Sequence, residues 1–262
     1  QRSSRPSSVG LSGIRGAGSC AVVGGIARSL MRAEVSGAGW GRSQVIFGVR
    51  GTGGGSWSGL RIKAMSTPKK RILIGLTGAS GICYGIRSLE LLAGLDNVET
   101  HLIVTSAARR TINLETDRTI EEVQELADAV YPIRDIAAGP ASGSFATSGM
   151  LVAPCSIRSL SAIANSHSSD LLTRAADVTL KERRPLVLMV RETPLHRGHL
   201  RLMDQVVEMG GIIFPPVPAF YTKPTTLESL VSHTSARAIE QLGIDIPEIN
   251  RWTGPPESNV QI

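Results

Sequence analysis

A glycine-rich turn between an apolar segment and a helical pattern constrains the fold of this chain more than any other feature. The run Arg71–Leu76 predicts a buried strand, the turn Thr77–Gly81 reads TGASG, and a helical pattern begins near Ile82. This order places backbone N–H groups and a serine hydroxyl around one point, where an anion such as a phosphate can bind. Because many glycine turns only reverse the chain direction, residues further along must support this interpretation.

Apolar strand-like segments alternate with amphipathic helical segments downstream of this turn. The expected strands are 71–76, 99–105, 150–153, 185–190 and 211–214, and the expected helices are 81–92, 107–115, 120–129, 156–165, 171–175, 195–209 and 225–242. Thr119 and Glu122 form a candidate capping box for one helix, and Pro154 is expected to end one strand. Strongly apolar strands that alternate with helices predict a parallel sheet covered on both faces.

The N-terminal segment differs in composition from the rest of the chain. Residues 1–66 are rich in Ser, Gly and Arg, and they carry a charge of +8 because nine basic residues stand against Glu34 alone. Residues 67–262 carry the remaining −2 of the total +6 and are expected to form the folded domain. The composition of residues 1–66 is typical of an organelle transit peptide. It predicts mitochondrial import, with plastid import or a disordered extension as the alternatives.

Several functional classes are not expected from the folded part. Its charge gives no reason to expect nucleic-acid binding, and no run of about 18 apolar residues predicts a membrane span. The sequence has no GxxxxGK[ST] or GxSxG motif, so neither a P-loop nucleotidase nor a serine hydrolase is expected. Cys83 and Cys155 have no CxxC partner, so no metal site is predicted, and Cys155 is interpreted as structural. His196 and His199 are interpreted as a surface pair.

Hydroxyl-bearing and basic residues recur where the expected strands end. Ser80 lies at the start of one helix, and Ser106 is expected to cap the next. Since the carboxyl ends of parallel strands meet at one edge of a sheet, these residues predict an anion site there, although each serine alone would be an ordinary helix cap. Glu192 beside Arg191 is either an ion-pair partner or an acid that protonates a leaving phosphate. The third expected helix adds Ser156, Arg158 and Ser159 to the same edge.

A second group of residues also suits a phosphate. It consists of Lys181, Arg191, Arg237 and Tyr221. Arginine binds phosphate through two parallel N–H donors and keeps its charge at any physiological pH. The alternative is that these residues are solvated charges and a tyrosine packed against apolar neighbours. The sequence therefore leaves a second phosphate site and an ordinary charged surface as the two interpretations.

Seven stretches of the folded part, taken together, match one known family, although none of them is specific alone. They are Gly78–Gly81, Ala141–Phe145, Pro154–Ser156, Arg174–Val178, Leu180–Arg184, Arg191–Leu195 and Phe214–Tyr221. From Lys70 to Trp252 the chain therefore resembles the UbiX/Pad1 family of flavin prenyltransferases. The resemblance implies a Rossmann- or flavodoxin-like three-layer α/β sandwich with a mostly parallel sheet, assembled as a homododecamer.

The resemblance also implies the reaction and its participants. Members of this family join the dimethylallyl group of dimethylallyl monophosphate to N5 and C6 of reduced FMN, and a UbiD-type decarboxylase then uses the prenylated FMN. The flavin supplies the nucleophilic atoms, so no protein nucleophile is required. No metal is expected, because cationic side chains and a proton donor stabilise the departing phosphate.

By motif position, the resemblance assigns roles to individual residues. Glu192 would carry the proton to the departing phosphate, Lys181 would assist it, and Glu115 matches an acidic position that reaches the active site. The residues implied to hold FMN are Gly78, Ala79, Ser80, Ser106, Ser156, Ile157, Arg158, Ser159 and Arg191. Those implied to hold dimethylallyl phosphate are Lys181, Arg191, Tyr221 and Arg237, with Trp252 near them.

Two other functions stay open at this point. The same fold could serve a flavin-dependent decarboxylase of phenylacrylic or cysteine-like acids. Relatives that act on cysteinyl substrates carry an Asn in the loop that here reads Ala141–Phe145, so that activity is disfavoured. A non-catalytic FMN carrier would bind the flavin without turnover, and an assay of prenyl transfer separates it from an enzyme.

Overall fold

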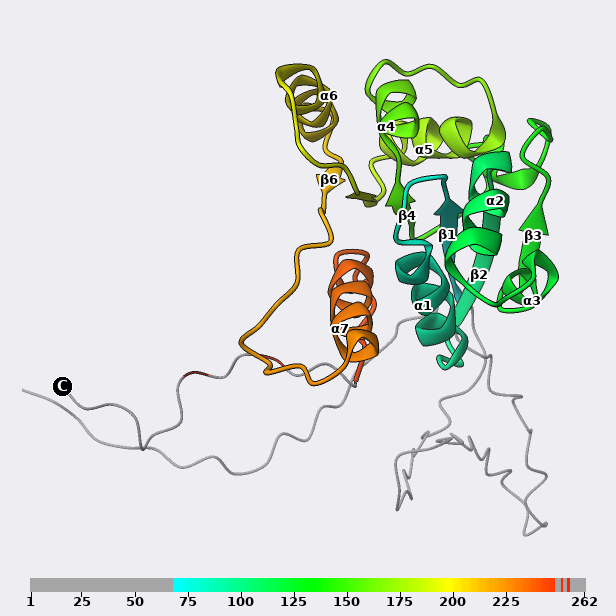
Figure 1. Cartoon of the computed structure of the whole chain (residues 1–262). Coiled ribbons are helices and arrows are strands. Elements are labelled where there is room, and N and C mark those ends of the chain that lie inside the picture. Colours follow the sequence, from blue (N-terminus) through cyan, green and yellow to red (C-terminus); the bar gives the residue numbers. More distant parts are fainter. Residues whose placement is uncertain (1–67, 248–250, 252–253, 255–262) are drawn as a thin grey trace, which may run out of the picture. The chain divides into compact units, whose positions relative to one another are not determined.

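Six parallel strands form the centre of the folded part (Figure 1). The computed structural model describes residues 68–247, 251 and 254 of the 262. The strands are β1 (Lys70–Leu76), β2 (Val98–Val104), β3 (Ala129–Tyr131), β4 (Gly149–Cys155), β5 (Leu186–Val190) and β6 (Ile212–Ile213). They lie in the order β3-β2-β1-β4-β5-β6, and every neighbouring pair is parallel. The predicted parallel α/β fold is therefore confirmed.

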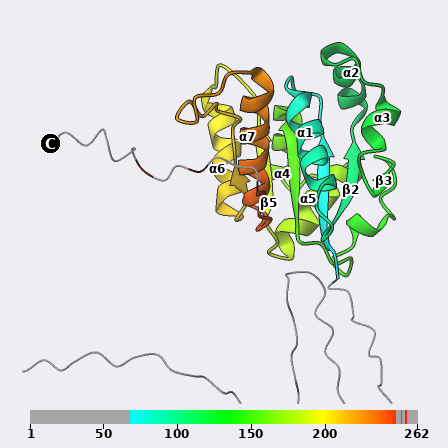
Figure 2. The same cartoon turned by 90° about the horizontal axis from the view of Figure 1, so that it is seen from below.

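Helices cover both faces of the sheet and complete a three-layer sandwich (Figure 2). Helices α1, α2, α3 and α7 contribute to one apolar cluster, and α4, α5 and α6 contribute to the other. Ile72 and Ile74 of β1 belong to the first cluster and Leu73 to the second, because successive side chains of a strand point to opposite faces. The helices are α1 (Ile82–Ala93), α2 (Ser106–Glu115), α3 (Ile120–Gln124), α4 (Ile157–Ala164), α5 (Leu171–Lys181), α6 (Arg197–Glu208) and α7 (Leu227–Glu240), and a 3-10 turn, η1 (Gly139–Ala141), precedes β4.

The order of the strands creates a switch point between β1 and β4. From β1 the chain proceeds outward through β2 to β3, and it then returns to the other side of β1 to form β4, β5 and β6. The connections after β1 and β4 therefore leave the sheet in opposite directions. Ligands of open α/β sheets bind in the crevice that opens outside the carboxyl ends of the strands at such a point.

The helix expected over residues 120–129 is shorter than predicted. Thr119 and Glu122 do form the predicted capping box, but α3 ends at Gln124 and Ala129–Tyr131 forms β3, which was not predicted. The Asp128 carboxylate accepts hydrogen bonds from the amide and hydroxyl of Thr100 in β2, at 2.8 and 3.0 Å. These contacts with a neighbouring strand, which local sequence does not reveal, hold the segment against the sheet edge.

Pro154 does not end its strand, contrary to prediction. Strand β4 continues through Pro154 to Cys155, and its register with β5 shifts between Val152 and Cys155. Proline lacks an N–H group, so it is tolerated in a strand where the ladder is irregular and no hydrogen bond is needed from it. A second difference is that α5 extends to Lys181, beyond the predicted end at residue 175.

Helix α1 packs very closely on the sheet at Gly85. A Cβ atom at Gly85 would lie less than 3.0 Å from both the carbonyl oxygen of Ala153 and Cδ2 of Leu76. Replacing a helical glycine by alanine gains about 1 kcal/mol of helix propensity, whereas overpacking costs about 1–3 kcal/mol or more. Since backbone must move here, we expect Gly85→Ala to lower the free energy of unfolding by about 1–2 kcal/mol net, as measured by guanidinium denaturation.

The matched control lies at the end of the same helix. Gly94 caps α1 with an ordinary φ of −75°, and the nearest atom to an added Cβ would be 3.6 Å away. Gly94→Ala should therefore leave the free energy of unfolding within about 0.5 kcal/mol of the original. Equal stability of both variants would contradict the close approach of α1 to β4.

Over the residues that the structure describes, no helix combines the length and apolar character needed to cross a membrane.

Candidate active site

The hydroxyl of Thr77 joins the two connections at the switch point. Thr77 Oγ1 donates to the carbonyl oxygen of Pro154 at 2.6 Å and accepts from the amide of Ser156 at 2.8 Å. Its side chain is almost fully buried, at 1% exposure. The turn after β1 is thus tied to the start of α4. No role was predicted for Thr77, although a hydroxyl directly after a buried strand is the signal that could have identified it.

Ser156, which was predicted at a helix start, is the N-cap of α4. Its backbone is extended, and its Oγ accepts from the amide of Ser159 at 3.3 Å, with the two hydroxyl oxygens 3.2 Å apart. Ile157 is partly buried and Arg158 is exposed. The amides of the first turn of a helix, together with its dipole, favour a negatively charged group at this end.

The cap of α2 is Thr105, and the prediction of Ser106 was wrong. Thr105 has an extended backbone and its Oγ1 accepts from the amide of Ala108 at 3.1 Å, whereas Ser106 is the first helical residue and is exposed. An N-cap must have a non-helical backbone, which only Thr105 has here. A Cβ at Gly78 would lie less than 3.0 Å from the Cβ of Ala107, so this glycine brings the TGASG turn against the start of α2.

The start of α1 is occupied by a carboxylate of the chain itself. Glu115, the last residue of α2, accepts hydrogen bonds from the amides of Gly81 and Ile82 at 2.8 and 3.0 Å, and the hydroxyl of Ser80 also bonds to it. Burial opposes ionisation of this carboxyl, but these hydrogen bonds and the nearby charge of Arg191 outweigh it, so its pKa lies below the ordinary value. The first amides of α1 are therefore hydrogen-bonded by a carboxylate of the protein itself, and the binding of a ligand anion at this helix start stays a prediction. Glu115 does reach the predicted edge of the sheet.

We expect Glu115→Gln to reduce stability at pH 7 by about 0.5–2 kcal/mol, because an uncharged amide is a weaker cap at a helix N-terminus. A depressed pKa in the folded state stabilises the fold at pH values above the ordinary 4.5 and loses that contribution as the pH falls further. The difference in unfolding free energy between the two proteins should therefore shrink below pH 4.5. Ser80→Ala should give a smaller difference of the same sign. A difference that stays constant down to pH 3 or so would contradict the capping role.

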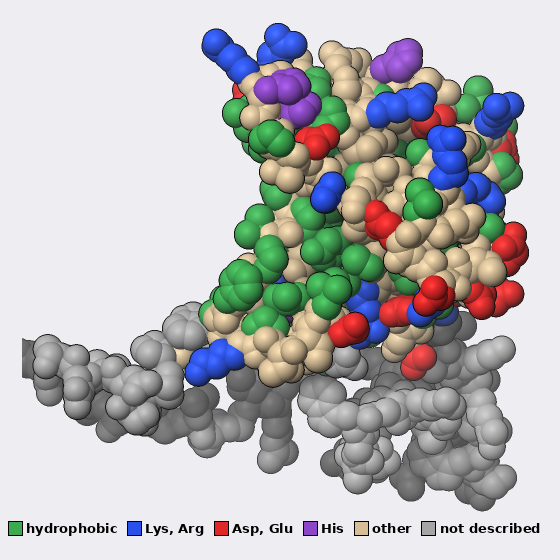
Figure 3. Space-filling view, in the orientation of Figure 1, with side chains coloured by type: hydrophobic (Ala, Val, Ile, Leu, Met, Phe, Trp, Pro, Cys, Tyr) green, Lys and Arg blue, Asp and Glu red, His purple; other side chains and the backbone are tan. Residues whose placement is uncertain are grey.

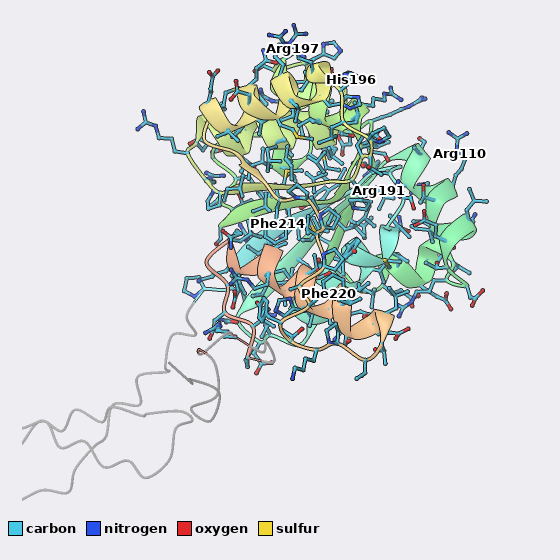
Figure 4. The ribbon with its side chains drawn as sticks, turned by 60° about the vertical axis from the view of Figure 1, so that its left-hand side comes forward. Arg110, Arg191, His196, Arg197, Phe214 and Phe220 are labelled. Atoms are coloured by element: carbon cyan, nitrogen blue, oxygen red, sulfur yellow. The ribbon has the colours of Figure 1, made fainter. Side chains whose placement is uncertain are left out.

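Arg191 and Glu192 follow β5 at the same edge. The amide of Arg191 donates to the carbonyl oxygen of Cys155 at 3.1 Å, which places it beside the start of α4. Both side chains are exposed, and within the described residues no ion pair joins them, so the first of the two interpretations of Glu192, an ion pair with Arg191, is not formed. Glu192 Oε1 instead accepts from the amide of Thr193 at 3.0 Å. In Figure 4, Arg191 lies between the α6 side, marked by His196, and the α7 side, marked by Phe220.

Lys181 lies at the opposite side of the sheet, where the parallel strands begin, whereas Arg191 lies where they end. Lys181 ends α5, and Arg184, which follows it, hydrogen-bonds the carbonyl oxygens of Gly143 and Phe145 just before β4 begins. Strand β1 has seven residues, so the two edges are about 20 Å apart. Within one chain, Lys181 therefore cannot meet Arg191. Helix α5 runs antiparallel to the strands, which returns its last residue to the edge where they begin.

Arg237 also lies apart from Arg191. Arg237 is in the last turn of α7 and pairs with Glu240. Just beyond α7, the carbonyl oxygen of Gly243 accepts from Lys70 Nζ at 3.0 Å, so this end of the helix lies where β1 begins. The Tyr221 hydroxyl is 3.3 Å from His233 Nε2 in the middle of α7. The predicted cluster of Lys181, Arg191 and Arg237 is not formed by a single chain. Trp252 lies outside the described residues.

The segment between β6 and α7, together with the first residue of α7, presents apolar side chains to solvent. Val217, Phe220 and Leu227 are 71%, 72% and 69% exposed. Figure 3 shows hydrophobic side chains gathered in the hollow between α6 and α7, on the face that also carries Arg191 in Figure 4. Exposed apolar surface of this kind marks a ligand pocket or a contact with another protein.

The comparisons with known proteins decide the family. The family model named Flavoprotein matches residues 61–237. Flavin prenyltransferase UbiX of Escherichia coli strain K12 is 54% identical over 187 residues, which cover 71% of this chain and 99% of that protein. The chain belongs to the UbiX family of flavin prenyltransferases. The resemblance noted in the sequence is confirmed.

Solved structures of UbiX-type proteins share the fold. AnUbiX (PadA1) in complex with FMN and dimethylallyl pyrophosphate is 46% identical, has a TM-score of 0.70, and is matched over 72% of this chain and 100% of its own. A dodecameric FMN-dependent UbiX-like decarboxylase from Escherichia coli O157:H7 is 43% identical, has a TM-score of 0.69, and is matched over 70% of this chain and 100% of its own. The folded part of this UbiX-family chain therefore corresponds to these relatives over their whole length.

Cys155 of this UbiX-family chain is a buried structural thiol. Cys155 is fully buried at the end of β4, and burial raises the pKa of its thiol to about 12, which agrees with a structural role. Among the residues with described positions, no group of three or more His, Cys, Asp and Glu side chains is placed to hold a metal ion. The rings of His196 and His199 lie with their centroids 3.6 Å apart and their planes tilted by 32° at the start of α6.

Proposed function

We propose that this protein transfers the dimethylallyl group of dimethylallyl monophosphate to N5 and C6 of reduced FMN, and that a UbiD-type decarboxylase receives the prenylated FMN. The observation that carries the proposal is the 46% identical AnUbiX structure, which contains FMN and dimethylallyl pyrophosphate and is matched over 100% of its length. The edge of the sheet at the switch point supports it, because its donors suit the phosphate and ribityl chain of a flavin.

The residues at the switch point fit FMN. The start of α4 offers first-turn amides and the hydroxyls of Ser156 and Ser159, and Arg191 adds one positive charge beside them. Gly78 and Ala79 form the wall contributed by the turn after β1, with the exposed Ser106 next to it. Neutral hydroxyls, amides and one arginine are the groups that bind a phosphate ester without a metal. FMN is therefore placed with its phosphate at the start of α4.

The roles of the chain's own residues follow from what they can donate. Reduced FMN supplies the nucleophilic atoms, so the protein need only bind, orient and exclude water. Glu192 is exposed at the same edge and donates a proton to the oxygen of the departing phosphate. Cationic side chains stabilise the charge that develops on that phosphate, and the apolar surface formed by Val217 and Phe220 helps to keep the allylic group from water.

Several subunits would build the pocket for the donor phosphate. Lys181 and Arg237 lie at the edge opposite Arg191, about 20 Å away along β1, so they cannot reach it within one chain. The UbiX-like relative described as dodecameric supports an assembly in which neighbouring chains supply them. In a homododecamer, Lys181, Tyr221 and Arg237 from adjacent subunits would meet the donor phosphate beside Arg191.

The test is an anaerobic incubation of the purified protein with reduced FMN and dimethylallyl monophosphate. The expected result is a flavin whose mass has increased by one C5 unit. This product should form without added metal and in the presence of a chelator. The same assay with dimethylallyl pyrophosphate shows which donor is preferred. A flavin of unchanged mass with both donors would overturn the proposed reaction, and a requirement for a divalent cation would overturn its metal-free form.

A decarboxylase remains the second candidate, because one relative at 43% identity is described as an FMN-dependent UbiX-like decarboxylase. The discriminating assay measures CO₂ release from phenylacrylic and cysteinyl acids by protein that carries FMN but no prenylated flavin. Release of CO₂ at a rate comparable with prenyl transfer would favour this second function. Its absence, together with the gain of a C5 unit by the flavin, would exclude it.

The N-terminal segment is proposed to direct the protein to mitochondria. The support for this proposal is compositional, because residues 1–66 lie outside the described residues. They carry nine basic residues against one acidic residue. Fused to a fluorescent protein in a plant cell, they are expected to send the signal to mitochondria. Replacement of the arginines by glutamine should abolish that distribution. A plastid or diffuse signal from the unaltered segment would contradict the proposal.

A further inference from the structure

A buried histidine in β2 contacts two aromatic rings next to the connection that leads into β4. His101 is only 3% exposed, its Nδ1 lies 2.9 Å from the Tyr131 hydroxyl, and the two rings stack with centroids 5.7 Å apart. Glu99 Oε1 approaches its Nε2 to 3.3 Å, an electrostatic contact without hydrogen-bond alignment. The reaction proposed above does not use this histidine, so its burial needs another explanation.

Phe145 is seated on this cluster. Its ring meets His101 edge-on with centroids 5.4 Å apart, and the Arg71 guanidinium carbon lies 5.1 Å from the centre of the Phe145 ring. Arg71 is itself held by Glu99, with Nε and Oε2 3.1 Å apart. The ring therefore lies between a buried imidazole and a paired guanidinium, which stabilise it through edge-to-face and cation–π contacts.

The loop that ends at Phe145 is held by two arginines. Arg174 Nε donates to the carbonyl oxygen of Ala141 at 3.2 Å. Arg184 donates to the carbonyl oxygens of Gly143 and Phe145 at 2.7 and 2.9 Å. Every second carbonyl group of Ala141–Phe145 thus accepts a hydrogen bond from an arginine of α5 or of the residues that follow α5. Hydrogen bonds to a charged donor are among the stronger ones in proteins, so the loop is firmly ordered.

The tip of this loop touches Lys181. An added Cβ at Gly143 would lie 2.7 Å from Lys181 Nζ, so the ammonium group rests against the glycine backbone. Glu182 pairs with Lys181 at the same place. A lysine side chain on a surface ordinarily samples many rotamers, and ordering it costs entropy when a ligand binds. A firm loop beneath the ammonium group reduces that cost before the ligand arrives.

We infer that Phe145 is a positioning residue for the donor phosphate. Its contacts with His101 and Arg71 hold the Ala141–Phe145 loop, and the loop holds the ammonium group of Lys181 in the orientation that a phosphate requires. This inference rests on the proposed function, because it needs Lys181 to contact dimethylallyl phosphate. It goes beyond that function by giving a task to buried His101 and to the partly buried rings of Tyr131 and Phe145 that contact it.

The first test is Phe145→Ala in the full-length protein. The KM for dimethylallyl monophosphate is expected to rise about tenfold, while kcat and the Kd for reduced FMN change by less than about twofold. Ile136→Ala is the matched control, because this apolar side chain belongs to the same β3–β4 connection and is 64% exposed. It should leave the KM unchanged. A Phe145→Ala variant that lowers kcat and FMN affinity together without changing the KM would overturn the inference.

A double-mutant cycle tests whether the effect passes through Lys181. In a Lys181→Ala background, Phe145→Ala should raise the KM by less than about twofold, because the group that it positions is already absent. Equal increases in both backgrounds would overturn the inference and leave the proposed function intact. A Lys181→Ala variant with an unchanged KM would instead overturn the role of Lys181 in the proposed function. If Phe145→Ala does not fold, Phe145→Leu should show a smaller increase with the same dependence on Lys181.

Discussion

Glu192→Gln is expected to slow prenyl transfer from dimethylallyl monophosphate by about 100- to 10,000-fold, the range in which general acid catalysis contributes. An amide has the shape of the carboxylic acid, and its oxygen can still accept the 3.0 Å hydrogen bond from the Thr193 amide. It has no proton to give to the departing phosphate. The Kd for reduced FMN should change by less than about twofold, because the proposed FMN contacts lie at the start of α4. Anaerobic single-turnover kinetics and a flavin titration measure the two quantities.

The donor itself provides an internal comparison for this variant. Pyrophosphate is a less basic leaving group than monophosphate and gains less from protonation. The loss of rate in Glu192→Gln should therefore be smaller with dimethylallyl pyrophosphate. Glu208→Gln, which changes an exposed carboxylate at the end of α6, should behave like the unaltered protein. An unchanged rate in Glu192→Gln, or an equal loss with both donors, would show that Glu192 is not the proton donor.

Thr77→Val is expected to lower the free energy of unfolding by about 2–4 kcal/mol. Valine has nearly the same shape as threonine, but it leaves the Pro154 carbonyl and the Ser156 amide without their 2.6 and 2.8 Å partners. Each buried polar group left unpaired costs about 1–3 kcal/mol, and the Ser156 amide is only partly buried. For a domain of this size, the melting temperature should fall by about 5–15 °C.

Thr77→Ser keeps the hydroxyl and should recover most of the lost stability. The same pair of variants tests the proposed flavin site, because Thr77 ties the turn after β1 to the start of α4. Reduced FMN should bind more weakly to Thr77→Val than to Thr77→Ser. Melting curves of the two variants that coincide would mean that the hydroxyl does not bridge the two connections.

Local features of the site could be read from the sequence because they depend on neighbouring residues. Ser156 was predicted at a helix start and does cap α4 through the amide of Ser159 three residues later. The capping box of Thr119 and Glu122 is likewise present. The prediction of Ser106 as the N-cap of α2 was wrong because the neighbouring Thr105 also carries a hydroxyl group that can cap a helix. Only the backbone conformation shows which of the two residues lies outside the helix.

Contacts between distant segments could not be read in this way. The Glu115 carboxylate reaches Gly81 and Ile82 across more than 30 residues and occupies a helix start that sequence alone offered to a ligand. Lys181 and Arg191 are close in sequence but lie at opposite edges of the sheet, because α5 runs against the strands. The sequence patterns therefore located the site residues without showing which of them one chain can bring together.

Side-chain type and spacing along the chain were enough to predict the alternation of apolar strands and helices, the resemblance to the family, and the set of polar residues at the strand ends. Three-dimensional packing was needed to show that the Thr77 hydroxyl joins two connections, that Glu115 caps α1, and that β3 completes the sheet. Such contacts depend on the direction and packing of elements that are far apart in sequence, and local periodicity carries no information about either.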